Sequence, residues 1–496
     1  MKTPKGNHSS RSRVETVVNL LALVLFFVLA VGFVATAIST RFLTPLLIAV
    51  LVAVVALLLV GILALRRSHR GGIRAVGSVL AMLFCLVFAF GIGYIRIGLD
   101  TLHRITSTQA ETVAMTIYVR QGDDRELSEL LTAPWGTLST DQANTQAALT
   151  KLEQDQGVAL TPQAYPGATE LVDALEQNQV DAILVSSNRL SALENMAEYA
   201  PILSSLRKVE TIQVTPSSDP PNAQSVPTVE EVFTMYISGN DTRSNDINDT
   251  ERSDVNIIAT VNPKTRQILL LSTPRDYFIP LSISNGVEDK LTHAGKYGID
   301  VSMDTLEMLY DINLDYYFKV NFSGFEQIID ALGGIDVDSQ YEFSSTISEH
   351  PIHYNKGINH LNGEGALYYV RERYSFVNGD FQRGIHQMQV IEAVMDKVLS
   401  PTILIQYVPM MEAMADCFRT SVPTDLIAAL VRSQLSGGGD WNVVRYYVSG
   451  HGENRYTFSA PRNKLNVIIP DESTVETTKE LMEQVRNGEV ITDPQA

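Results

Sequence analysis

The stretch that decides the fold class is 254–276, with the sequence DVNIIATVNPKTRQILLLSTPRD. Two apolar runs, 254–262 and 267–274, flank residues 263–266, which contain a proline and three polar residues. Aliphatic and β-branched runs of this length on either side of a short polar connection are typical of a β-hairpin. The stretch therefore predicts two strands that pair with each other.

Outward from this hairpin, strand-like and helix-like patterns alternate. Residues 232–239 and 313–322 have the composition of strands. Residues 302–312 and 322–332 have the apolar spacing of amphipathic helices. Such alternation predicts an α/β layer architecture for this part of the chain.

Charged side chains recur at the predicted strand ends: Asp241, Arg243, Arg252, Asp254, Arg275 and Asp276. A second polar set falls in VRERYSFVNGDFQRGIHQ, residues 370–387: Arg371, Arg373, Asp380, Arg383 and Gln387. Strand-end loops are where α/β folds place ligand sites, and converging arginines match the oxygens of a polyanion such as phosphate. Two aspartates at neighbouring strand ends could in addition hold Mg²⁺.

Each of these residues, taken singly, has a plainer alternative. Arg–Asp neighbours are often solvated surface charges or structural ion pairs. Geometry adds weight to the site hypothesis, since Arg371 and Arg373 share a face if that segment is extended. Asp380, Arg383 and Gln387 share a face if a helix begins there.

The N-terminal region predicts a membrane anchor. Three apolar runs, 17–38, 44–65 and 75–95, each have the length needed to cross a bilayer. Ten Lys and Arg against two acidic residues give residues 1–100 a net charge of +8, so the rest of the chain, within an overall −18, carries −26. Basic residues before the first run and at 66–74 place the N-terminus and this loop in the cytoplasm, which puts the acidic body outside the cell.

These patterns predict a multi-pass plasma-membrane protein with six segments. They are a cytoplasmic tail (1–13), three transmembrane helices (14–100), a small extracellular α/β accessory domain (105–214), a linker rich in Pro and Ser (215–230), an α/β domain (231–470) and a C-terminal tail (471–496), for which a surface helix with a loose end is expected.

Several function classes are disfavoured. The acidic body lacks the basic footprint of a nucleic-acid binder. Cys85 and Cys417 lie in different predicted segments, so no disulfide within the chain is expected. The sequence contains neither G-x-x-x-x-G-K-[ST] nor G-x-S-x-G, and His350, His353 and His360 lack the spacing of a zinc site.

The chain resembles the LytR-CpsA-Psr (LCP) family of bacterial cell-wall glycopolymer ligases. The resemblance rests on six consecutive segments: SGNDTR (238–243), 251–276, KLTHAGKYG (290–298), FSGFEQIIDALGGIDVD (322–338), LNGEGALYYVRERYS (361–375) and GDFQRGIHQMQVI (379–391). The three-helix anchor and accessory domain resemble the streptococcal capsule-type branch. The resemblance implies an α/β/α catalytic domain with a central mixed sheet. It further implies transfer of a glycopolymer, such as capsule or teichoic acid, from a polyprenyl pyrophosphate lipid to peptidoglycan by phosphoryl transfer.

The resemblance also implies roles for individual residues. Asp241 and Asp254 would bind Mg²⁺ or Mn²⁺, and Arg275, Asp380 and Arg371 would be catalytic, with Asp380 assisting deprotonation of the acceptor hydroxyl. The residues that would hold the pyrophosphate are Arg252, Arg275, Arg371, Arg373, Arg383 and Gln387. Those that would line a tunnel for the lipid tail, with ordinary core as the alternative, are Phe318, Val320, Phe325, Ile328, Ile329 and Leu332.

One residue departs from the family pattern. His386 stands where the family often has a second arginine, which predicts weaker or pH-dependent lipid binding. Two other functions remain open: a polyprenyl-pyrophosphate hydrolase with the same residues, and a non-catalytic membrane scaffold for polysaccharide export machinery. The identity of the polymer, the acceptor sugar and the oligomeric state are left open by the sequence.

Overall fold

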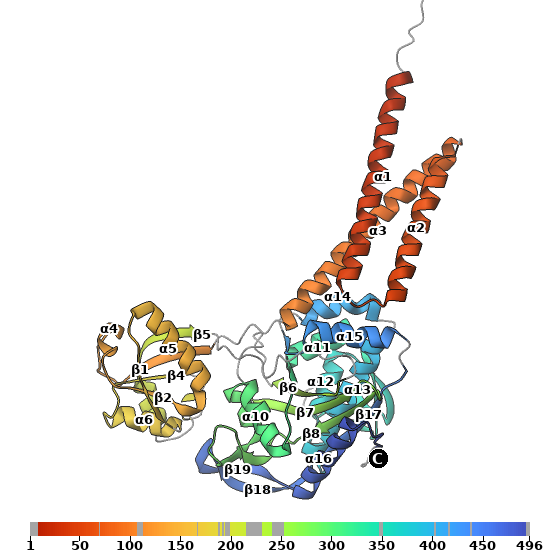
Figure 1. Ribbon diagram of the computed structural model, residues 1–496. Helices are drawn as coiled ribbons and strands as arrows, with labels where there is room; N and C mark the ends of the chain where they lie inside the picture. Colours follow the sequence, from red (N-terminus) through yellow and green to blue (C-terminus); the bar gives the residue numbers. More distant parts are fainter. Residues whose placement is uncertain are drawn as a thin grey trace, which may run out of the picture. The chain divides into compact units, whose positions relative to one another are not determined.

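The computed structural model describes residues 8–68, 70–106, 113–165, 167–186, 189–190, 193, 199–214, 231–240, 252–346, 351–400, 403–414, 417–436 and 439–492. The predicted linker 215–230, together with Asp241, Arg243 and His350, lies outside the described residues. The chain divides into two compact units (Figure 1), one of which contains the N-terminal helices together with 407–412 and 423–439.

Three long helices form the N-terminal part: α1 (His8–Ser39), α2 (Pro45–Arg66) and α3 (Gly71–Thr106). Each contains a stretch long and apolar enough to cross a membrane, by length and composition. Phe26 of α1, Ile62 of α2 and Phe88 of α3 are buried where the helices meet. Most other large side chains of these helices are exposed, as expected for surfaces that face lipid.

The accessory domain is a five-stranded sheet in the order β3-β2-β4-β1-β5. Its elements are β1 (Val113–Val119), α4 (Leu127–Leu130), β2 (Trp135–Leu138), α5 (Gln142–Gln156), β3 (Gln163–Tyr165), α6 (Ala168–Glu176), β4 (Ala182–Ser186), α8 (Ala200–Ser205) and β5 (Arg207–Val214). Alternate residues of β1 and β4 point to opposite faces, where α5 covers one core and α6 the other. The predicted small α/β domain is thus present.

The second α/β domain is built on a six-stranded mixed sheet in the order β16-β11-β6-β7-β8-β17. The strands are β6 (Phe233–Asn240), β7 (Ser253–Asn262), β8 (Gln267–Ser272), β11 (Tyr316–Asn321), β16 (Phe418–Thr420) and β17 (Asn442–Tyr447). The predicted hairpin is confirmed, because β7 and β8 pair antiparallel with Ile257 opposite Ser272. β11 runs parallel to β6, and β17 runs parallel to β8.

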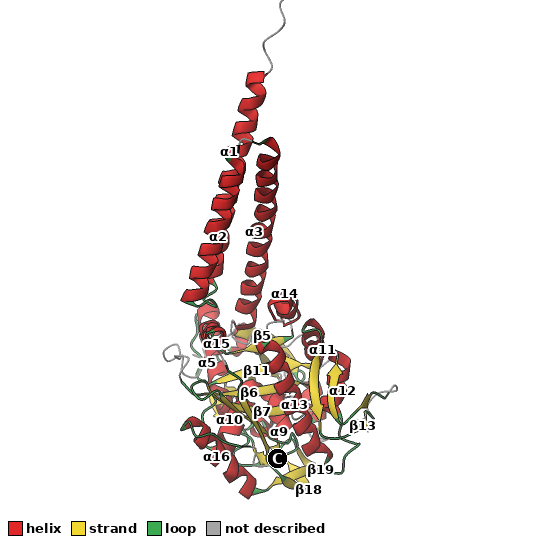
Figure 2. Ribbon diagram, turned by 90° about the vertical axis from the view of Figure 1, so that its right-hand side faces the viewer, coloured by secondary structure: helices red, strands yellow, loops and turns green. Residues whose placement is uncertain are grey.

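Helices cover both faces of this sheet (Figure 2), which confirms the predicted α/β/α architecture. One face carries α9 (Leu291–Ala294), α10 (Ile299–Tyr310) and α16 (Glu472–Arg486), and the other carries α11 (Phe322–Ala331), α12 (Gly363–Arg371) and α13 (Gly379–Leu399). Two further helices are α14 (Ile403–Met414) and α15 (Thr424–Leu435). Smaller strands complete the domain: β9 (Phe278–Pro280), β10 (Glu288–Lys290), β12 (Ile335–Ser339), β13 (Phe343–Ser344), β14 (His353–Tyr354), β15 (Gly357–Leu361), β18 (Gly450–Thr457) and β19 (Ala460–Pro470).

The C-terminal helix corrects one expectation. The sequence predicts a surface helix with a loose tail from Asp471, but α16 packs against β7 and β8. Its residues Val475, Met482 and Val485 are almost fully buried in the same core as Tyr236 and Leu269. Since these three positions recur at helical spacing, α16 buries a complete apolar face and belongs to the domain core.

Candidate functional site

The register of the sheet gathers several strand ends at one edge. Asn321 of β11 lies opposite Asn240 of β6, and Asn240 lies opposite Ser253 at the start of β7. The adjacent strand, β8, ends at Ser272 beside this point. Residues that follow or precede these positions are therefore delivered to one edge, as the strand-end hypothesis requires.

Arg275 and Asp254 form the first half of the candidate site. Arg275 Nη1 lies 2.5 Å from Asp254 Oδ2, so two of the charged residues at the strand ends are in direct contact. Thr292 of the short helix α9 lies near the other carboxylate oxygen, with its hydroxyl 3.4 Å from Asp254 Oδ1. Next to them, Lys290 Nζ lies 3.1 Å from Asp276 Oδ1.

The start of α13 forms the second half. Asp380 Oδ1 lies 3.2 Å from Arg383 Nη2 and 3.5 Å from Arg373 Nη1. The predicted helix that places Asp380 and Arg383 on one face is therefore present. Gln387 lies one turn farther along the same helix and is buried.

A close approach of α13 to β8 joins the two halves. A methyl group at Gly384 would lie only 2.5 Å from Ser272 Oγ, so this contact requires a glycine. The adjacent residue Arg383 is only 8% exposed. Burial lowers the pKa of Arg383, and the neighbouring charges of Arg275 and Arg373 act in the same direction, while Asp380 and Asp254 oppose them. The five charged groups thus form one electrostatic cluster, which we call the arginine cluster: Asp254, Arg275, Arg373, Asp380 and Arg383.

Some buried polar atoms in and beside the arginine cluster make no hydrogen bond within the described part of the chain. Among the described residues, Arg275 Nε and Asp380 Oδ1 are buried and have charged neighbours but no hydrogen-bond partner. Nε2 of Gln382, which lies between Asp380 and Arg383 in the sequence, likewise has no hydrogen-bond partner in the described part of the chain. A buried donor without a hydrogen bond is costly, so two unused donors beside an arginine cluster indicate a site that an anion completes.

Arg371 lies at the end of α12 and not in an extended segment. The condition under which Arg371 and Arg373 would share one face is therefore not met. Asn362 caps this helix through Gly365 N–H, and Tyr369 and Val370 on its buried face hold it in place. The guanidinium of Arg371 stands 4.8 Å from the centre of the Phe322 ring, directly after the end of β11. Arg371 therefore stands where the polar sheet edge meets apolar side chains.

Glu372 fixes the loop between the two arginines. Its buried carboxylate accepts hydrogen bonds from the N–H groups of Thr346, Tyr374 and Ser375. Burial alone would raise the pKa of Glu372, but these hydrogen bonds outweigh it and lower the pKa. Glu372 thus orders the segment that carries Arg373.

The predicted metal ligands are only partly represented. Asp241 lies outside the described residues, whereas Asp254 is half-buried and already faces Arg275. Within the described residues, no group of three His, Cys, Asp or Glu side chains could hold a metal ion. One carboxylate with the hydroxyl of Thr292 fits Mg²⁺ only when phosphate oxygens supply further ligands. The remaining predicted anion ligand, Arg252, is exposed directly before β7.

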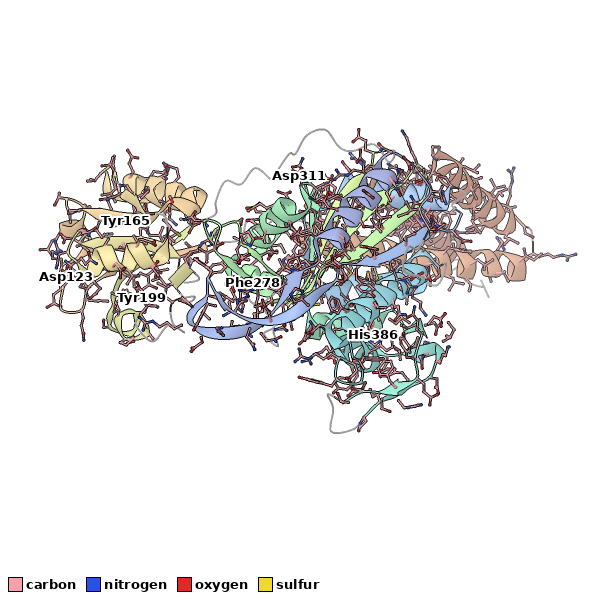
Figure 3. The ribbon with its side chains drawn as sticks, turned by 90° about the horizontal axis from the view of Figure 1, so that it is seen from below. Asp123, Tyr165, Tyr199, Phe278, Asp311 and His386 are labelled. Carbon is pink, nitrogen blue, oxygen red and sulfur yellow. The ribbon has the colours of Figure 1, made fainter. Side chains whose placement is uncertain are left out.

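His386, which stands where the family often has a second arginine, lies in an aromatic core. His386 lies on α13 (Figure 3) and is only 1% exposed. Its ring stacks on Phe343 with centroids 5.1 Å apart and its Nδ1 donates to the carbonyl of Tyr369. Burial lowers the pKa of His386 to about 4. A neutral ring in an aromatic core has no charge to offer a phosphate.

The predicted lipid-contacting residues differ in burial. Ile329 and Leu332 are fully buried, which fits ordinary core. The others are half-buried on β11 and α11: Phe318, Val320, Phe325 and Ile328. Phe322 and Phe325 pack against the same buried cluster, so part of this apolar surface lies beside Arg371.

Sequence reasoning missed several residues at this edge: Lys290, Thr292, Phe322, Glu372 and Gln382. All five lie inside the segments that carry the family resemblance, so a signal for them was present. They were missed because neutral residues and isolated charges have no pattern that marks them as ligands.

Comparisons with known proteins agree on the family. A model described as the LytR_cpsA_psr family matches residues 194–481. Proteins named polyisoprenyl-teichoic acid–peptidoglycan teichoic acid transferase TagU are similar: that of Bacillus cereus is 35% identical over 196 residues, covering 39% of this chain and 62% of the relative. That of Halalkalibacterium halodurans is 32% identical over 256 residues, covering 51% of this chain and 79% of the relative.

The chain spans about three fifths of the length of the Bacillus cereus relative. Among solved structures, the crystal structure of B. subtilis TagV is 27% identical, with a TM-score of 0.44, and the match covers 53% of this chain and 99% of that one. Because the family model covers more than half of the 496 residues, this chain belongs to the LytR_cpsA_psr family.

Proposed function

We propose that this protein transfers an anionic glycopolymer from a polyprenyl pyrophosphate lipid to peptidoglycan at the outer face of the membrane. The observation that carries the proposal is the arginine cluster with its unused buried donors at the sheet edge. Membership of the family and the names of the TagU relatives give the substrate class. The distribution of basic residues between the N-terminal helices supports the outward placement of the acidic body.

The reaction is a phosphoryl transfer. An acceptor hydroxyl oxygen forms a bond to the phosphorus that bears the glycopolymer, and the bond from that phosphorus to the bridging pyrophosphate oxygen breaks. Polyprenyl phosphate leaves with the bridging oxygen, and the hydroxyl proton passes to a base. Such a reaction depends on charge neutralisation and in-line positioning rather than on covalent help from the protein.

The chain's own side chains supply these requirements. Arg275 Nε and Gln382 Nε2 donate to phosphate oxygens, since both are buried donors without a hydrogen-bond partner in the described part of the chain. Asp380 orients Arg373 and Arg383 through Oδ1, and its other oxygen, Oδ2, takes the proton of the acceptor hydroxyl. Arg371, beside the ring of Phe322, contacts the junction between the pyrophosphate and the lipid tail.

A divalent cation fits this proposal as a group shared with the substrate. Asp254, Thr292 and, from its motif position, Asp241 would hold Mg²⁺ or Mn²⁺ together with phosphate oxygens. When bound, the ion would neutralise charge on the pyrophosphate.

The full-length protein in lipid nanodiscs tests the proposal. It is incubated with a short polyprenyl-pyrophosphoryl oligosaccharide, peptidoglycan oligomers and Mg²⁺, and mass spectrometry detects a phosphodiester-linked product. We expect the product with the native chain and with Arg455→Ala, an exposed arginine of β18, but not with Arg275→Ala. Polyprenyl phosphate without a linked product would establish a hydrolase instead, and an absence of turnover with retained lipid binding would favour a scaffold.

A further inference from the structure

The turn between the first two membrane helices is an ordered structure. Arg41 has a left-handed backbone conformation with φ of 59°. The N–H of Arg41 donates to Ile38 O, and Thr44 caps α2 by accepting from Leu47 N–H. These bonds fix residues 40–43 and leave both the guanidinium and the carbonyl of Arg41 outside the hydrogen bonds of the two helices.

One face of α15 contacts this turn at two points. Asp425 Oδ1 lies 2.7 Å from Arg41 Nη1, and Arg432 Nη1 donates to the carbonyl of Arg41 at 2.6 Å. Positions seven apart fall on the same side of a helix, so both contacts come from one face. Ala428 and Ala429 lie between them and are buried. Their side chains are small, so they allow the backbone of α15 to approach its neighbours closely. The turn and α15 belong to the same compact unit, and Figures 1 and 2 show them side by side.

The position of α15 in the chain gives this contact a mechanical consequence. The helix connects β16 with β17, which are the two edge strands of the six-stranded sheet. The turn follows directly after a 20-residue apolar span, Leu20–Ser39, so in a bilayer it must lie at the membrane surface. α15 also exposes Val431 and Leu435, 37% and 49% exposed and one turn apart, as expected for a helix that touches the bilayer interface.

We propose that residues 40–43 form a docking element for α15, so that this helix lies at the same membrane surface as the turn. In this arrangement the first two helices position α15 as well as anchoring the chain. An exposed ion pair is weak on its own, but Arg432 adds a charged donor to the same residue. Since all groups belong to one chain, their high effective concentration favours the docked state. The contact also requires the turn to lie on the same side of the membrane as the catalytic domain.

Distance measurements on the full-length protein in vesicles test this without any substrate. Nitroxide labels are placed at two exposed positions, Ser39→Cys at the end of α1 and Ser436→Cys after α15, with both native cysteines replaced by alanine. Pulsed electron–electron double resonance records the distance between the two labels. We expect a narrow distance distribution in the cysteine-replaced protein that is otherwise native. Asp425→Arg should broaden it, with the docked population reduced about two- to fivefold. Glu412→Arg, an acid-to-arginine control on the exposed side of α14, should leave the distribution narrow.

The charge swap Arg41→Asp with Asp425→Arg is the decisive variant. Asp tolerates the left-handed conformation of Arg41, and Arg432 can still bond to the carbonyl at position 41. We expect the swap to restore the narrow distribution. A broad distribution in the native background, an unchanged one in Asp425→Arg, or a swap that fails to restore it would each overturn the proposal.

A membrane-impermeant thiol reagent gives a second readout in the same vesicles. We expect it to reach Ser39→Cys and Ser436→Cys from the same side of the bilayer, because docking requires both positions there. Labelling of the two cysteines from opposite sides would overturn the proposal as well.

The test of docking is independent of catalysis. The measurement uses neither donor lipid nor peptidoglycan, so a failure of docking would leave the proposed transferase reaction untouched, and a failure of transfer would leave docking untouched.

Discussion

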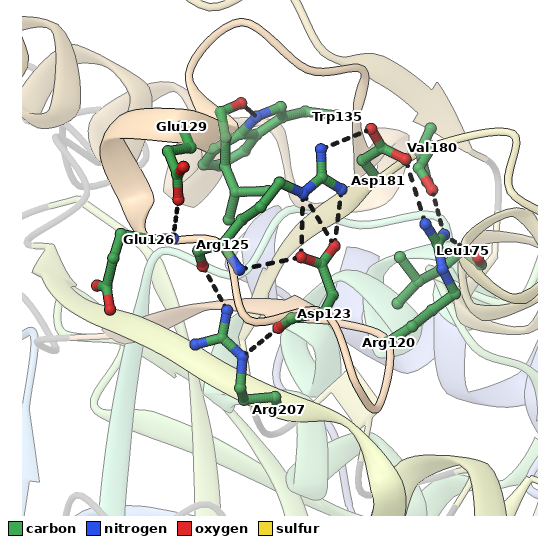
Figure 4. Close-up of polar contacts among 11 residues, drawn as sticks. Arg120, Asp123, Arg125, Glu126, Glu129, Trp135, Leu175, Val180, Asp181 and Arg207 are labelled. Atoms are coloured by element: carbon green, nitrogen blue, oxygen red, sulfur yellow. Dashed lines mark hydrogen bonds and ion pairs between the residues drawn. The ribbon is translucent and has the colours of Figure 1, made fainter.

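Two arginine-rich clusters of the same chain have opposite designs. In the accessory domain, Arg125 makes two parallel hydrogen bonds to Asp123 and a third to Asp181 (Figure 4). Arg120 donates to the carbonyls of Leu175 and Val180 as well as to Asp181. Within the described part of the chain, every buried side-chain nitrogen and oxygen atom of this network has a hydrogen-bond partner. The network consists of Arg120, Asp123, Arg125, Asp181 and Arg207.

The arginine cluster of the second α/β domain contains the same residue types but leaves some of their buried polar atoms without a hydrogen bond. Arg275 Nε, Asp380 Oδ1 and the neighbouring Gln382 Nε2 are buried and lack hydrogen-bond partners among the described residues. Ion pairs alone thus do not separate a structural network from a ligand site. What separates them is whether the donors are used up inside the protein.

Removing one arginine from each cluster is the strongest test of this difference. Arg275→Ala should lower transfer about 10²- to 10³-fold, because it removes a charged donor from the developing phosphate charge. Its thermal midpoint should fall by only a few degrees. Arg125→Ala should leave transfer within about twofold and instead destabilise the accessory domain by about 1–2 kcal/mol, the loss of partly exposed charged hydrogen bonds. Transfer rates and thermal unfolding of both variants give the comparison.

Equal losses of transfer in the two variants would contradict the distinction. Arg275→Lys serves as a further control, since it keeps the charge but loses the planar donor pair, and we expect it to remain impaired.

The packing that joins the halves of the arginine cluster gives the next largest effect. Gly384→Ala places a methyl group against Ser272 and should push α13 away from β8. Transfer should fall about 10- to 100-fold, since small displacements of binding groups are costly, and stability should fall by about 1–3 kcal/mol. Gly452→Ala is the matched control, because a methyl group there meets nothing within 4 Å. Full activity of Gly384→Ala would show that α13 need not approach β8 closely.

The accessory network should respond to acid and not to substrate. Hydrogen bonds from Arg125 lower the pKa of Asp123 from 3.8 to about 2. The folded-state pKa is below the unfolded one, so this stabilisation is complete above about pH 4 and disappears as pH falls through about 2. In a Trp441→Phe background, fluorescence of the buried Trp135 reports unfolding of this domain. Asp123→Asn should lose about 1–2 kcal/mol at neutral pH and show a flatter acid transition than the parent.

The fold was predictable from the sequence where burial alone decides structure. The hairpin 254–274, the helix 322–332 and the three apolar helices all follow from periodicity and run length. α16 was not recognised as core, because its apolar residues are spaced among many charged ones. The sequence also does not show that Arg371 is the last residue of a helix. That helix begins at its cap, Asn362, which lies outside the arginine motif.

The site was predictable as a set of charges but not as a geometry. Sequence order could place Arg275 and Asp254 at strand ends, and the family resemblance named their roles. The sequence could not show that Gln382 contributes a buried donor or that Glu372 orders the loop that carries Arg373. Both depend on surroundings distant in sequence, such as Thr346. The buried position of His386 cannot be predicted for the same reason, since its aromatic neighbour Phe343 comes from another segment.

The smallest expected effect concerns this histidine. The folded-state pKa of His386 is about 4 and lies below its ordinary value of 6.5. Between these values the unfolded chain binds a proton that the folded chain does not, so stability must fall as the pH decreases from about 6.5 toward 4. One such group contributes a slope of about 1 kcal/mol per pH unit. His386→Gln should therefore be less stable than the parent at pH 7.5, where it loses stacking on Phe343, yet its stability should change less between pH 6.5 and 4.

Urea unfolding of the full chain in a Trp135→Phe background, with Trp441 as reporter, measures this slope at each pH. His451→Gln, a substitution at an exposed histidine of β18, should retain the parent's slope. Parallel pH profiles for the parent and His386→Gln would mean that His386 titrates normally in the folded state. In that case the histidine would be accessible to protons despite its aromatic surroundings, and its exclusion from the charged site would have to be reconsidered.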